Sequence, residues 1–135
     1  MWRVRAGMLA LVIVCSTAQA SNWLSLGKND AGTTETFIDV SSIQIEGNLR
    51  RAWDKVNKLK THTQKGPNGK YLSSTVGKLE YNCTEQMTRS HAFTFYNEDG
   101  TNESASAESL PGPWEPVVPD TEMAVDMKFI CAWKQ

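Results

Sequence analysis

Long hydrophobic runs are absent from this sequence beyond its first fifteen residues. The one run present, Met8–Cys15, is far shorter than the roughly 20 apolar residues that span a bilayer. Histidine and cysteine are scarce, with two and three copies among 135 residues. No G-x-S-x-G motif and no C-x-x-C or H-x-x-x-H spacing occurs. These absences argue against a retained transmembrane helix, a serine hydrolase and a zinc site, and we expect no enzyme activity, no bound metal and no cofactor.

The first twenty residues have the order of parts that marks a secretory signal peptide. Arg3 and Arg5 form a positive n-region, Met8–Cys15 is the apolar core, and an A-x-A cleavage site ends at Ala20. We expect cleavage after Ala20, which leaves one exported domain of residues 21–135. Without the two arginines the net charge changes from −1 to −3, and this mild acidity argues against nucleic-acid binding.

Lipidation of Cys15 is the alternative fate of this segment. Lipoprotein signals need a small residue directly before the cysteine, whereas Val14 and Ile13 are bulky and β-branched. We therefore interpret Cys15 as an ordinary apolar residue of a discarded segment. The expected location is the periplasm or the outer cell surface, without a membrane anchor.

The two cysteines left after cleavage, Cys83 and Cys131, predict a disulfide because thiols oxidise in exported proteins. They stand 48 residues apart in the chain. Closing a loop of this length is worth about 4 kcal/mol in the chain-entropy model. A metal site that joins Cys83 to His91 or His62 is the competing interpretation, but the spacing of these residues does not support it.

Alternating and turn-rich segments predict a mainly β domain. We expect strands at 21–26, 36–40, 75–83, 89–97 and 101–109, with a loop at 64–70. Phe93 and Phe95 should share one strand face, and Glu98-Asp99-Gly100 carries the Asp-Gly hairpin signal. The segment Leu49–Thr61 is ambiguous, since its apolar residues are spaced by 4, 3 and 3 as in a helix.

A C-terminal helix is predicted after Pro119-Asp120-Thr121, where either polar side chain can cap its first turn. Its apolar face comprises Met123, Met127, Ile130 and Cys131, and the pattern directs Asp126 and Lys128 away from that face. The expected fold is α+β, with an antiparallel sheet of about five to six strands and the C-terminal helix packed on one face. One disulfide should join the helix to the 75–83 strand.

The order of short motifs resembles that of the surface-adhesin protein E family of Gram-negative bacteria. The resemblance runs from Trp23 to Cys131 and is carried by TFIDVSSI, the segment around Trp53, YNC, FYNEDG and WEPVVPDT, followed by the C-terminal helix. It implies a strand around Trp53, against the helical spacing, and a Cys83–Cys131 bridge. It also implies an adhesin that binds host matrix or plasma proteins such as laminin, vitronectin and plasminogen.

Charge is unevenly distributed along the chain. From Arg50 to Lys78 the net charge is +7, whereas from Leu79 to Asp126 it is −9. A basic patch can attract anionic partners, including sulfated glycans and acidic protein surfaces. The candidate ligand-binding residues are Arg50, Arg51, Lys55, Lys58, Lys60, Lys65 and Lys70. The alternative is that the two segments are neighbours in the sheet and neutralise each other.

Three functions follow, of which we favour a non-enzymatic binding protein of the bacterial envelope. The second is a periplasmic structural or inhibitory protein acting on another envelope protein or a lysozyme. The third, an enzyme, would need His62 or His91 beside a second catalytic group, while Glu98 and Asp99 are expected to be solvated turn residues. The sequence does not predict the oligomeric state.

Overall fold

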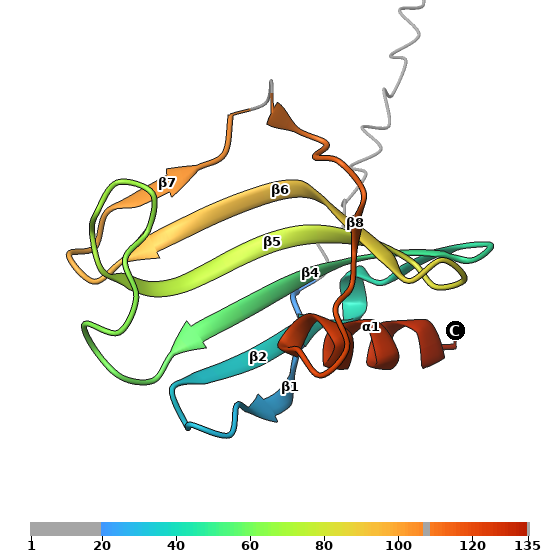
Figure 1. Ribbon diagram of the computed structural model, residues 1–135, viewed down its shortest axis with the longest axis horizontal. Helices are drawn as coiled ribbons and strands as arrows, with labels where there is room; N and C mark the ends of the chain where they lie inside the picture. Colours follow the sequence, from blue (N-terminus) through green and yellow to red (C-terminus); the bar gives the residue numbers. More distant parts are fainter. Residues whose placement is uncertain (1–19, 107–108, 135) are drawn as a thin grey trace, which may run out of the picture.

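A computed structural model describes residues 20–106 and 109–134 of the chain (Figure 1). The predicted signal peptide lies outside the described residues, apart from Ala20. Among the described residues, no helix is both long enough and apolar enough to cross a membrane.

An antiparallel sheet of eight strands forms the described part of the chain. The strands are β1 (Trp23–Lys28), β2 (Thr34–Asp39), β3 (Gln44–Glu46), β4 (Leu49–Lys58), β5 (Leu72–Asn82), β6 (Met87–Asn97), β7 (Asn102–Ser104) and β8 (Glu115–Pro116). Their order is β1-β2-β4-β5-β6-β7, with β3 also paired to β4 and β8 also paired to β6. A single 3₁₀ turn, η1 (Val40–Ser42), and one helix, α1 (Glu122–Ala132), complete the described elements.

The expectation of five to six strands is wrong because short edge strands escaped the sequence pattern. The predicted 101–109 strand pairs with β6 only over Asn102–Ser104, after which the backbone leaves the sheet edge. β8 comes from the proline-rich segment after Leu110, outside the strands that the sequence predicted. β8 is only two residues long. Pro116 cannot donate a ladder hydrogen bond, and it is tolerated here because it lies at the sheet edge.

The ambiguous segment is a strand, as the resemblance implied and against its helical spacing. β4 pairs with both β2 and β5 and is therefore central in the sheet. Ala52 and Asp54 are buried on one face, while Arg51, Trp53 and Lys55 alternate onto the other face. The helical spacing of 4, 3 and 3 predicted that Trp53 belongs to the core. In the strand, its side chain instead lies on the face opposite α1.

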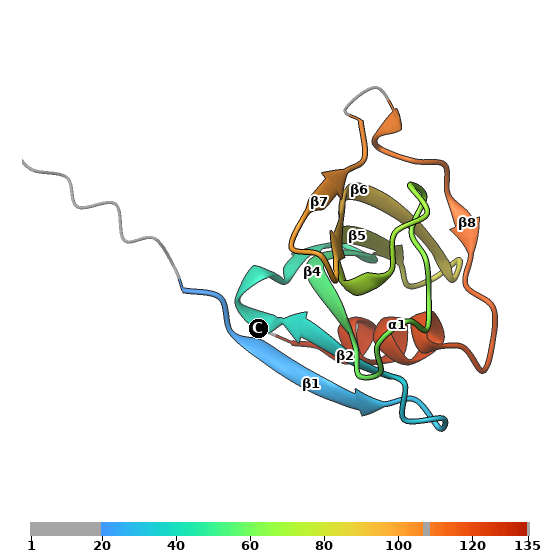
Figure 2. The same cartoon turned by 90° about the vertical axis from the view of Figure 1, so that its left-hand side faces the viewer.

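Helix α1 covers one face of the curved sheet, and the main core lies between them (Figure 2). Ile38, Ala52, Leu79 and Tyr81 from three central strands pack against Ile130 of the helix. Fully burying one such aliphatic side chain contributes about 2 kcal/mol. Met123, Met127 and Cys131 flank this cluster, which confirms the predicted apolar face of the helix.

The helix begins as predicted but buries one residue that the pattern directed to solvent. Thr121 caps α1, because its hydroxyl accepts a hydrogen bond from the backbone N–H of Ala124. Lys128 is exposed, as expected. Asp126 is only 4% exposed, so the prediction that it lies away from the core is wrong. It lies one helical turn before Ile130, which is itself buried, and this position faces the sheet.

The predicted disulfide is present between Cys83 and Cys131, with their Cα atoms 5.8 Å apart. It joins the chain just after β5 to the last turn of α1. We call this side of the sheet the disulfide end. We call the opposite side the loop end, where the loop 59–71, the β6–β7 hairpin, the β1–β2 turn and the first turn of α1 lie (Figure 1).

Candidate binding surface

The seven candidate basic residues do not form one patch, because four of them are spread along β4 from one end of the sheet to the other and three lie in the following loop. Arg50 and Arg51 lie near the disulfide end, and Lys55 follows in the middle of the strand. The remaining four residues belong to the loop end: Lys58, Lys60, Lys65 and Lys70.

Arg51 is held by a buried carboxylate rather than left for a ligand. Its Nε donates to Glu80 Oε2 at 2.6 Å, while Arg89 Nε donates to Glu80 Oε1 at 2.6 Å. A β-bulge at His91 brings that ring within 3.2 Å of the same Glu80 oxygen. Burial opposes ionisation of Glu80, but the hydrogen bonds from Arg51, His91 and Arg89 outweigh it and hold its pKa at about 2.

Arg50 and Lys55 also make contacts within the protein, although Arg50 Nε is buried without a hydrogen-bond partner among the described residues. Arg50 Nη1 donates to the carbonyl oxygens of Gly47 at 2.6 Å and Leu49 at 3.0 Å. Lys55 Nζ lies 4.4 Å from the ring centroid of Trp23 and 5.1 Å from that of Phe37. These cation–π contacts stabilise the ammonium group above two aromatic faces. Each of the three residues in the first half of the basic segment therefore already makes a contact within the protein.

At the loop end the lysines are more accessible. Lys60 and Lys65 are exposed, and Lys65 Nζ lies 5.1 Å from the ring centroid of Tyr71. Lys58 is half-buried and donates to Gln64 Oε1 at 2.6 Å. Lys70 Nζ lies 3.0 Å from Asp99 Oδ2, in a pair whose two side chains are 46% and 49% exposed. A pair of this kind contributes at most about 1 kcal/mol, so a ligand can compete with it.

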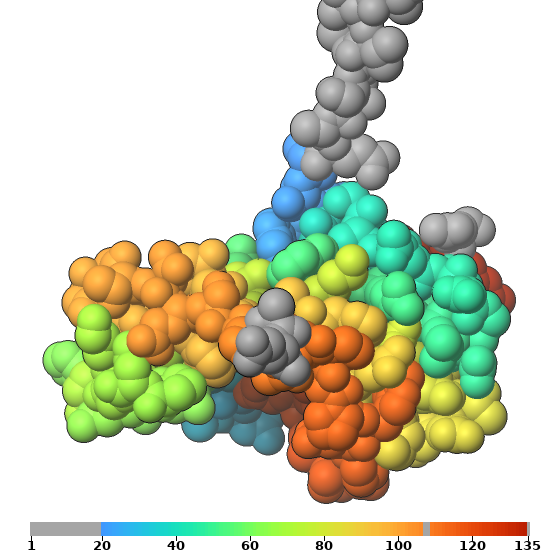
Figure 3. Space-filling view, turned by 90° about the horizontal axis from the view of Figure 1, so that it is seen from above, coloured from blue at the N-terminus to red at the C-terminus, as the bar shows by residue number. Residues whose placement is uncertain are grey.

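The loop 59–71 lies beside the β6–β7 hairpin, as Figure 3 shows at one end of the molecule. His62 links the two, because its backbone N–H donates to Glu98 Oε1 at 2.7 Å and its ring stacks 4.6 Å from Tyr71. The backbone of His62 adopts a φ of 55°, a region that is strained for a residue other than glycine. The hairpin contacts therefore hold this loop in one shape instead of leaving it free.

Cross-strand neutralisation, the alternative to a basic patch, thus holds for Arg51 with Glu80 at the disulfide end and for Lys70 with Asp99 at the loop end, and not for Arg50 or Lys55. Glu98 and Asp99 are turn residues, as expected, and Gly100 closes the turn with a φ of 86°. Hydrogen bonds from Thr101 hold the pKa of Asp99 at about 2. His62 lies 3.2 Å from Glu98 and His91 lies 3.2 Å from Glu80, in two separate clusters.

A second charged cluster, which the sequence analysis missed, lies under α1. Tyr81 Oη donates to Asp54 Oδ2 at 2.7 Å, and the carboxyl groups of Asp54 and Asp126 are within hydrogen-bonding reach of each other. Burial and the neighbouring Asp126 charge raise the pKa of Asp54 well above its ordinary value. Burial also raises the pKa of Asp126, to about 7. Two buried carboxyl groups in this arrangement are coupled, so ionisation of one disfavours ionisation of the other.

A family model described as surface-adhesin protein E matches residues 23–132. This chain belongs to the surface-adhesin protein E family. The resemblance seen in the sequence is thereby confirmed, and membership identifies the chain as an adhesin-like surface protein. No curated protein sequence matches the chain.

Solved structures of Haemophilus influenzae protein E share the fold of this family member. One is 20% identical, covers 80% of this chain and 83% of its own, and has a TM-score of 0.53. A second, from non-typeable Haemophilus influenzae, is 22% identical, covers 86% and 79% respectively, and has a TM-score of 0.54. At this level of identity the likeness shows a common fold and leaves the ligand open.

Proposed function

We propose that this chain is an exported, non-enzymatic binding protein of the bacterial envelope that engages an anionic host surface through its loop end. The partners of matching chemistry are acidic patches on matrix or plasma proteins and sulfated glycans. Family membership supports a binding role, and the contacts of the candidate residues support the choice of the loop end over the other half of the basic segment.

One observation carries this proposal. The arginines near the disulfide end are held by hydrogen bonds to Glu80 or to backbone carbonyl oxygens. In contrast, Lys60 and Lys65 are exposed on a loop whose shape is fixed by the neighbouring hairpin. A rigid loop loses little conformational entropy on binding, and exposed lysines speed the approach of an anionic partner.

Binding is tested on immobilised laminin, vitronectin, plasminogen and heparin, each at low and at high salt. We expect at least one of them to bind, with an affinity that falls as salt increases because the contacts are electrostatic. The double variant Lys60→Glu/Lys65→Glu should weaken that binding about tenfold or more. The matched control is Lys128→Glu/Lys134→Glu, which reverses two exposed charges on and just after α1.

Equal affinity of the loop variant and the control variant would contradict the use of the loop end. Failure to bind any of the four ligands at low salt would contradict the function itself. Circular dichroism of both variants checks that the fold is intact.

Location is tested separately by fractionation with lipid labelling. Protease-accessible protein on whole cells supports the adhesin role, and unlabelled protein supports cleavage after Ala20 rather than lipidation of Cys15. Protection from protease until the outer membrane is opened would instead favour a periplasmic partner.

A further inference from the structure

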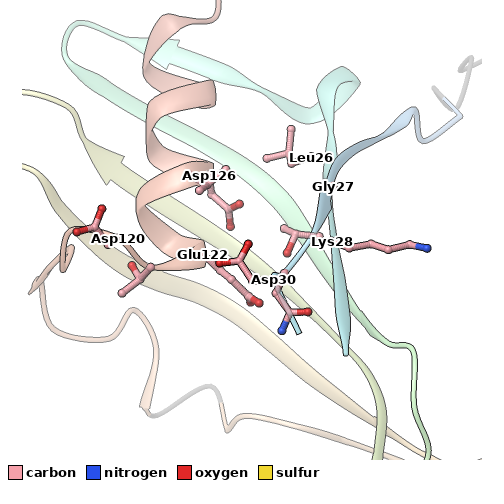
Figure 4. Close-up of a pocket in the computed structure, with 11 residues that line it drawn as sticks. Leu26, Gly27, Lys28, Asp30, Asp120, Glu122 and Asp126 are labelled. Carbon is pink, nitrogen blue, oxygen red and sulfur yellow. The ribbon is translucent and has the colours of Figure 1, made fainter. Parts of the chain in front are cut away.

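The two faces of the sheet present different chemistry to a ligand. On the α1 face, a cavity of about 420 Å³ beside the first turn of the helix is bordered by the carboxylates of Asp30, Asp120 and Glu122 (Figure 4). Such a cluster repels anions. The described residues contain one helix, α1, so no helix covers the opposite face (Figure 2). That face carries lysine and aromatic side chains instead.

Strand register brings these side chains together on the face opposite α1, which we call the open face. Trp53 of β4 lies on it, and its cross-strand partner in β5 is Lys78. The next residue of β4 on the same face, Lys55, pairs with Phe37 of β2, and its Nζ lies 4.4 Å from the ring centroid of Trp23. Trp53 therefore lies between two lysines, and two further aromatic rings flank one of them.

The free charge on the open face is positive. No carboxylate of the described residues lies within ion-pairing distance of Lys78. The carboxylates of this face are already engaged within the protein. Glu35 lies opposite Lys28 in the β1–β2 ladder, and Asp39 is buried and accepts hydrogen bonds from backbone N–H groups. Glu80 is held by its two arginines. An anionic ligand is therefore attracted to the surface around Trp53.

Polar side chains adjoin the lysines on the same face. Asn57 and Ser74 form a cross-strand pair two residues beyond Lys55, toward the loop end. An amide and a hydroxyl can each donate and accept a hydrogen bond. Because the side chains of a strand alternate between the two faces, these groups point to the same side as Trp53. The open face thus combines an aromatic centre, two cations and neutral polar groups.

These chemical features define the ligand. The face of an indole ring packs against the C–H groups of a pyranose ring, lysine ammonium groups donate to carboxylates, and the amide and hydroxyl side chains pair with sugar hydroxyls. Two lysines beside one indole match a chain with a carboxylate on alternate sugar rings, whereas a densely sulfated chain would leave most of its charges unpaired. We propose that the open face binds an unsulfated acidic glycan of this kind.

An anionic membrane surface fits the open face less well. Insertion into the headgroup region requires apolar side chains that protrude from the protein. Trp23, Phe37 and Trp53 are instead half-buried among their neighbours in the sheet. The proposed glycan site is also separate from the loop 59–71 and does not rest on the function proposed for that loop.

Isothermal titration calorimetry of the purified, oxidised protein with a hyaluronan hexasaccharide tests the proposal. A chitin hexasaccharide, which has pyranose rings but no carboxylate, is the neutral comparison. We expect saturable binding of the hyaluronan fragment, about tenfold or more tighter than that of the chitin fragment. The affinity should fall as salt increases, because the lysine contacts are electrostatic. A change in tryptophan emission should accompany binding.

Two variants locate the site. Trp53→Ala should weaken hyaluronan binding about tenfold or more, since it removes the ring on which the sugar packs. Lys78→Glu should weaken it about fivefold or more. The matched controls are Trp133→Ala and Lys128→Glu, at an indole and a lysine on the α1 side, and both should bind like the parent protein. Trp53→Phe keeps an aromatic ring and the fold, so it should retain most of the affinity.

Four results would overturn the proposal: no saturable binding of the hyaluronan fragment, equal affinity for the chitin fragment, equal affinities of the open-face variants and their controls, or loss of binding in Lys60→Glu/Lys65→Glu. Vesicles that contain phosphatidylglycerol are the last probe. Binding of these vesicles that Trp53→Ala abolishes, without binding of the glycan, would make the open face a membrane-binding surface instead. The proposed function of the loop 59–71 is unaffected by these outcomes, because it is tested with variants of that loop on its own panel of ligands.

Discussion

Buried carboxylates are compensated differently at the two ends of the sheet. At the disulfide end Glu80 is fully buried, yet two guanidinium groups and one imidazole surround it and its pKa falls to about 2. Toward the loop end Asp126 is also buried, but its nearest charged neighbours are Asp54 and Glu122, and its pKa rises to about 7. The Glu80 carboxylate is thus surrounded by cationic hydrogen-bond donors, whereas the Asp126 carboxyl group has almost none.

This difference separates structural charge from charge that is available for binding. A compensated buried carboxylate holds neighbouring strands together and leaves nothing for a ligand. An uncompensated one lowers stability and gains from a partner that the chain does not supply. The exposed lysines Lys60 and Lys65 lie at the loop end, where we propose that a ligand binds, while the compensated carboxylate contributes to stability at the other end. Four changes test this division, in order of decreasing effect.

Breaking the disulfide should have the largest effect on stability. Replacing Cys83 and Cys131 together with serine removes the constraint on a loop of 48 residues. The free energy of unfolding should fall by about 4 kcal/mol in the chain-entropy model. Guanidinium denaturation of the variant and the oxidised parent measures the difference. A loss below about 1 kcal/mol would show that packing alone holds this end together.

Glu80→Gln should cost about 3 kcal/mol, because it leaves Arg51 and Arg89 without their shared buried counter-charge. Urea denaturation at neutral pH measures the loss. Glu103→Gln, on the exposed edge strand β7, is the matched control and should change stability by less than about 0.5 kcal/mol. A loss no larger than that of the control would mean that Glu80 is not the centre of this cluster.

The pH dependence of stability should have opposite signs at the two sites. The folded pKa of Asp126 is raised from 3.8 to about 7, so the folded chain binds the extra proton and stability falls as pH rises through this range. Asp126→Asn should remove that slope and add about 2 kcal/mol at pH 8. The folded pKa of Glu80 is lowered from 4.5 to about 2. The stability that its ionised form contributes is therefore fully present above pH 4.5 and is lost as the pH falls toward 2.

Thermal unfolding between pH 3 and pH 9 measures both slopes. A parent protein that gains stability steadily from pH 4 to pH 8, with no change of slope in Asp126→Asn, would contradict the difference between the two carboxylates.

Tyr81→Phe should have the smallest effect, about 1 kcal/mol, because it removes one hydrogen bond to Asp54 and leaves the ring packed. It should also raise the pKa of the Asp54–Asp126 pair further, since the hydrogen bond from Tyr81 favours the ionised form of Asp54. Tyr96→Phe, at a 40% exposed tyrosine, is the control and should leave both stability and this pKa unchanged. Urea denaturation and a pH titration of both variants check these outcomes.

Much of the fold follows from local sequence signals. Alternation places the long strands β5 and β6, the Asp-Gly pair marks the hairpin at Gly100, and Thr121 caps the helix, whereas β4 was implied only by the family resemblance. The short strands β3 and β8 could not be predicted, because two or three residues carry no periodicity and pair only where a neighbouring edge is free, whereas β7 was predicted but is shorter than expected.

The site was harder to predict because compensation of charge depends on contacts across strands. Arg51 and Lys60 look alike in the sequence, yet one is bonded to Glu80 and the other is exposed. Glu80 reaches His91 only because a bulge adds a residue to β6. Strand alternation could have indicated that Asp54 is buried with Ala52, once the segment was read as a strand, but not that Asp126 of α1 would face it.

A pH titration of the side-chain carboxyl carbons by NMR tests the difference between the two ends most directly. We expect Asp126 to titrate near pH 7 and Glu80 to stay ionised down to about pH 2. If both groups titrate near pH 4, as solvent-exposed carboxylates do, the contrast between a compensated and an uncompensated buried carboxylate is contradicted.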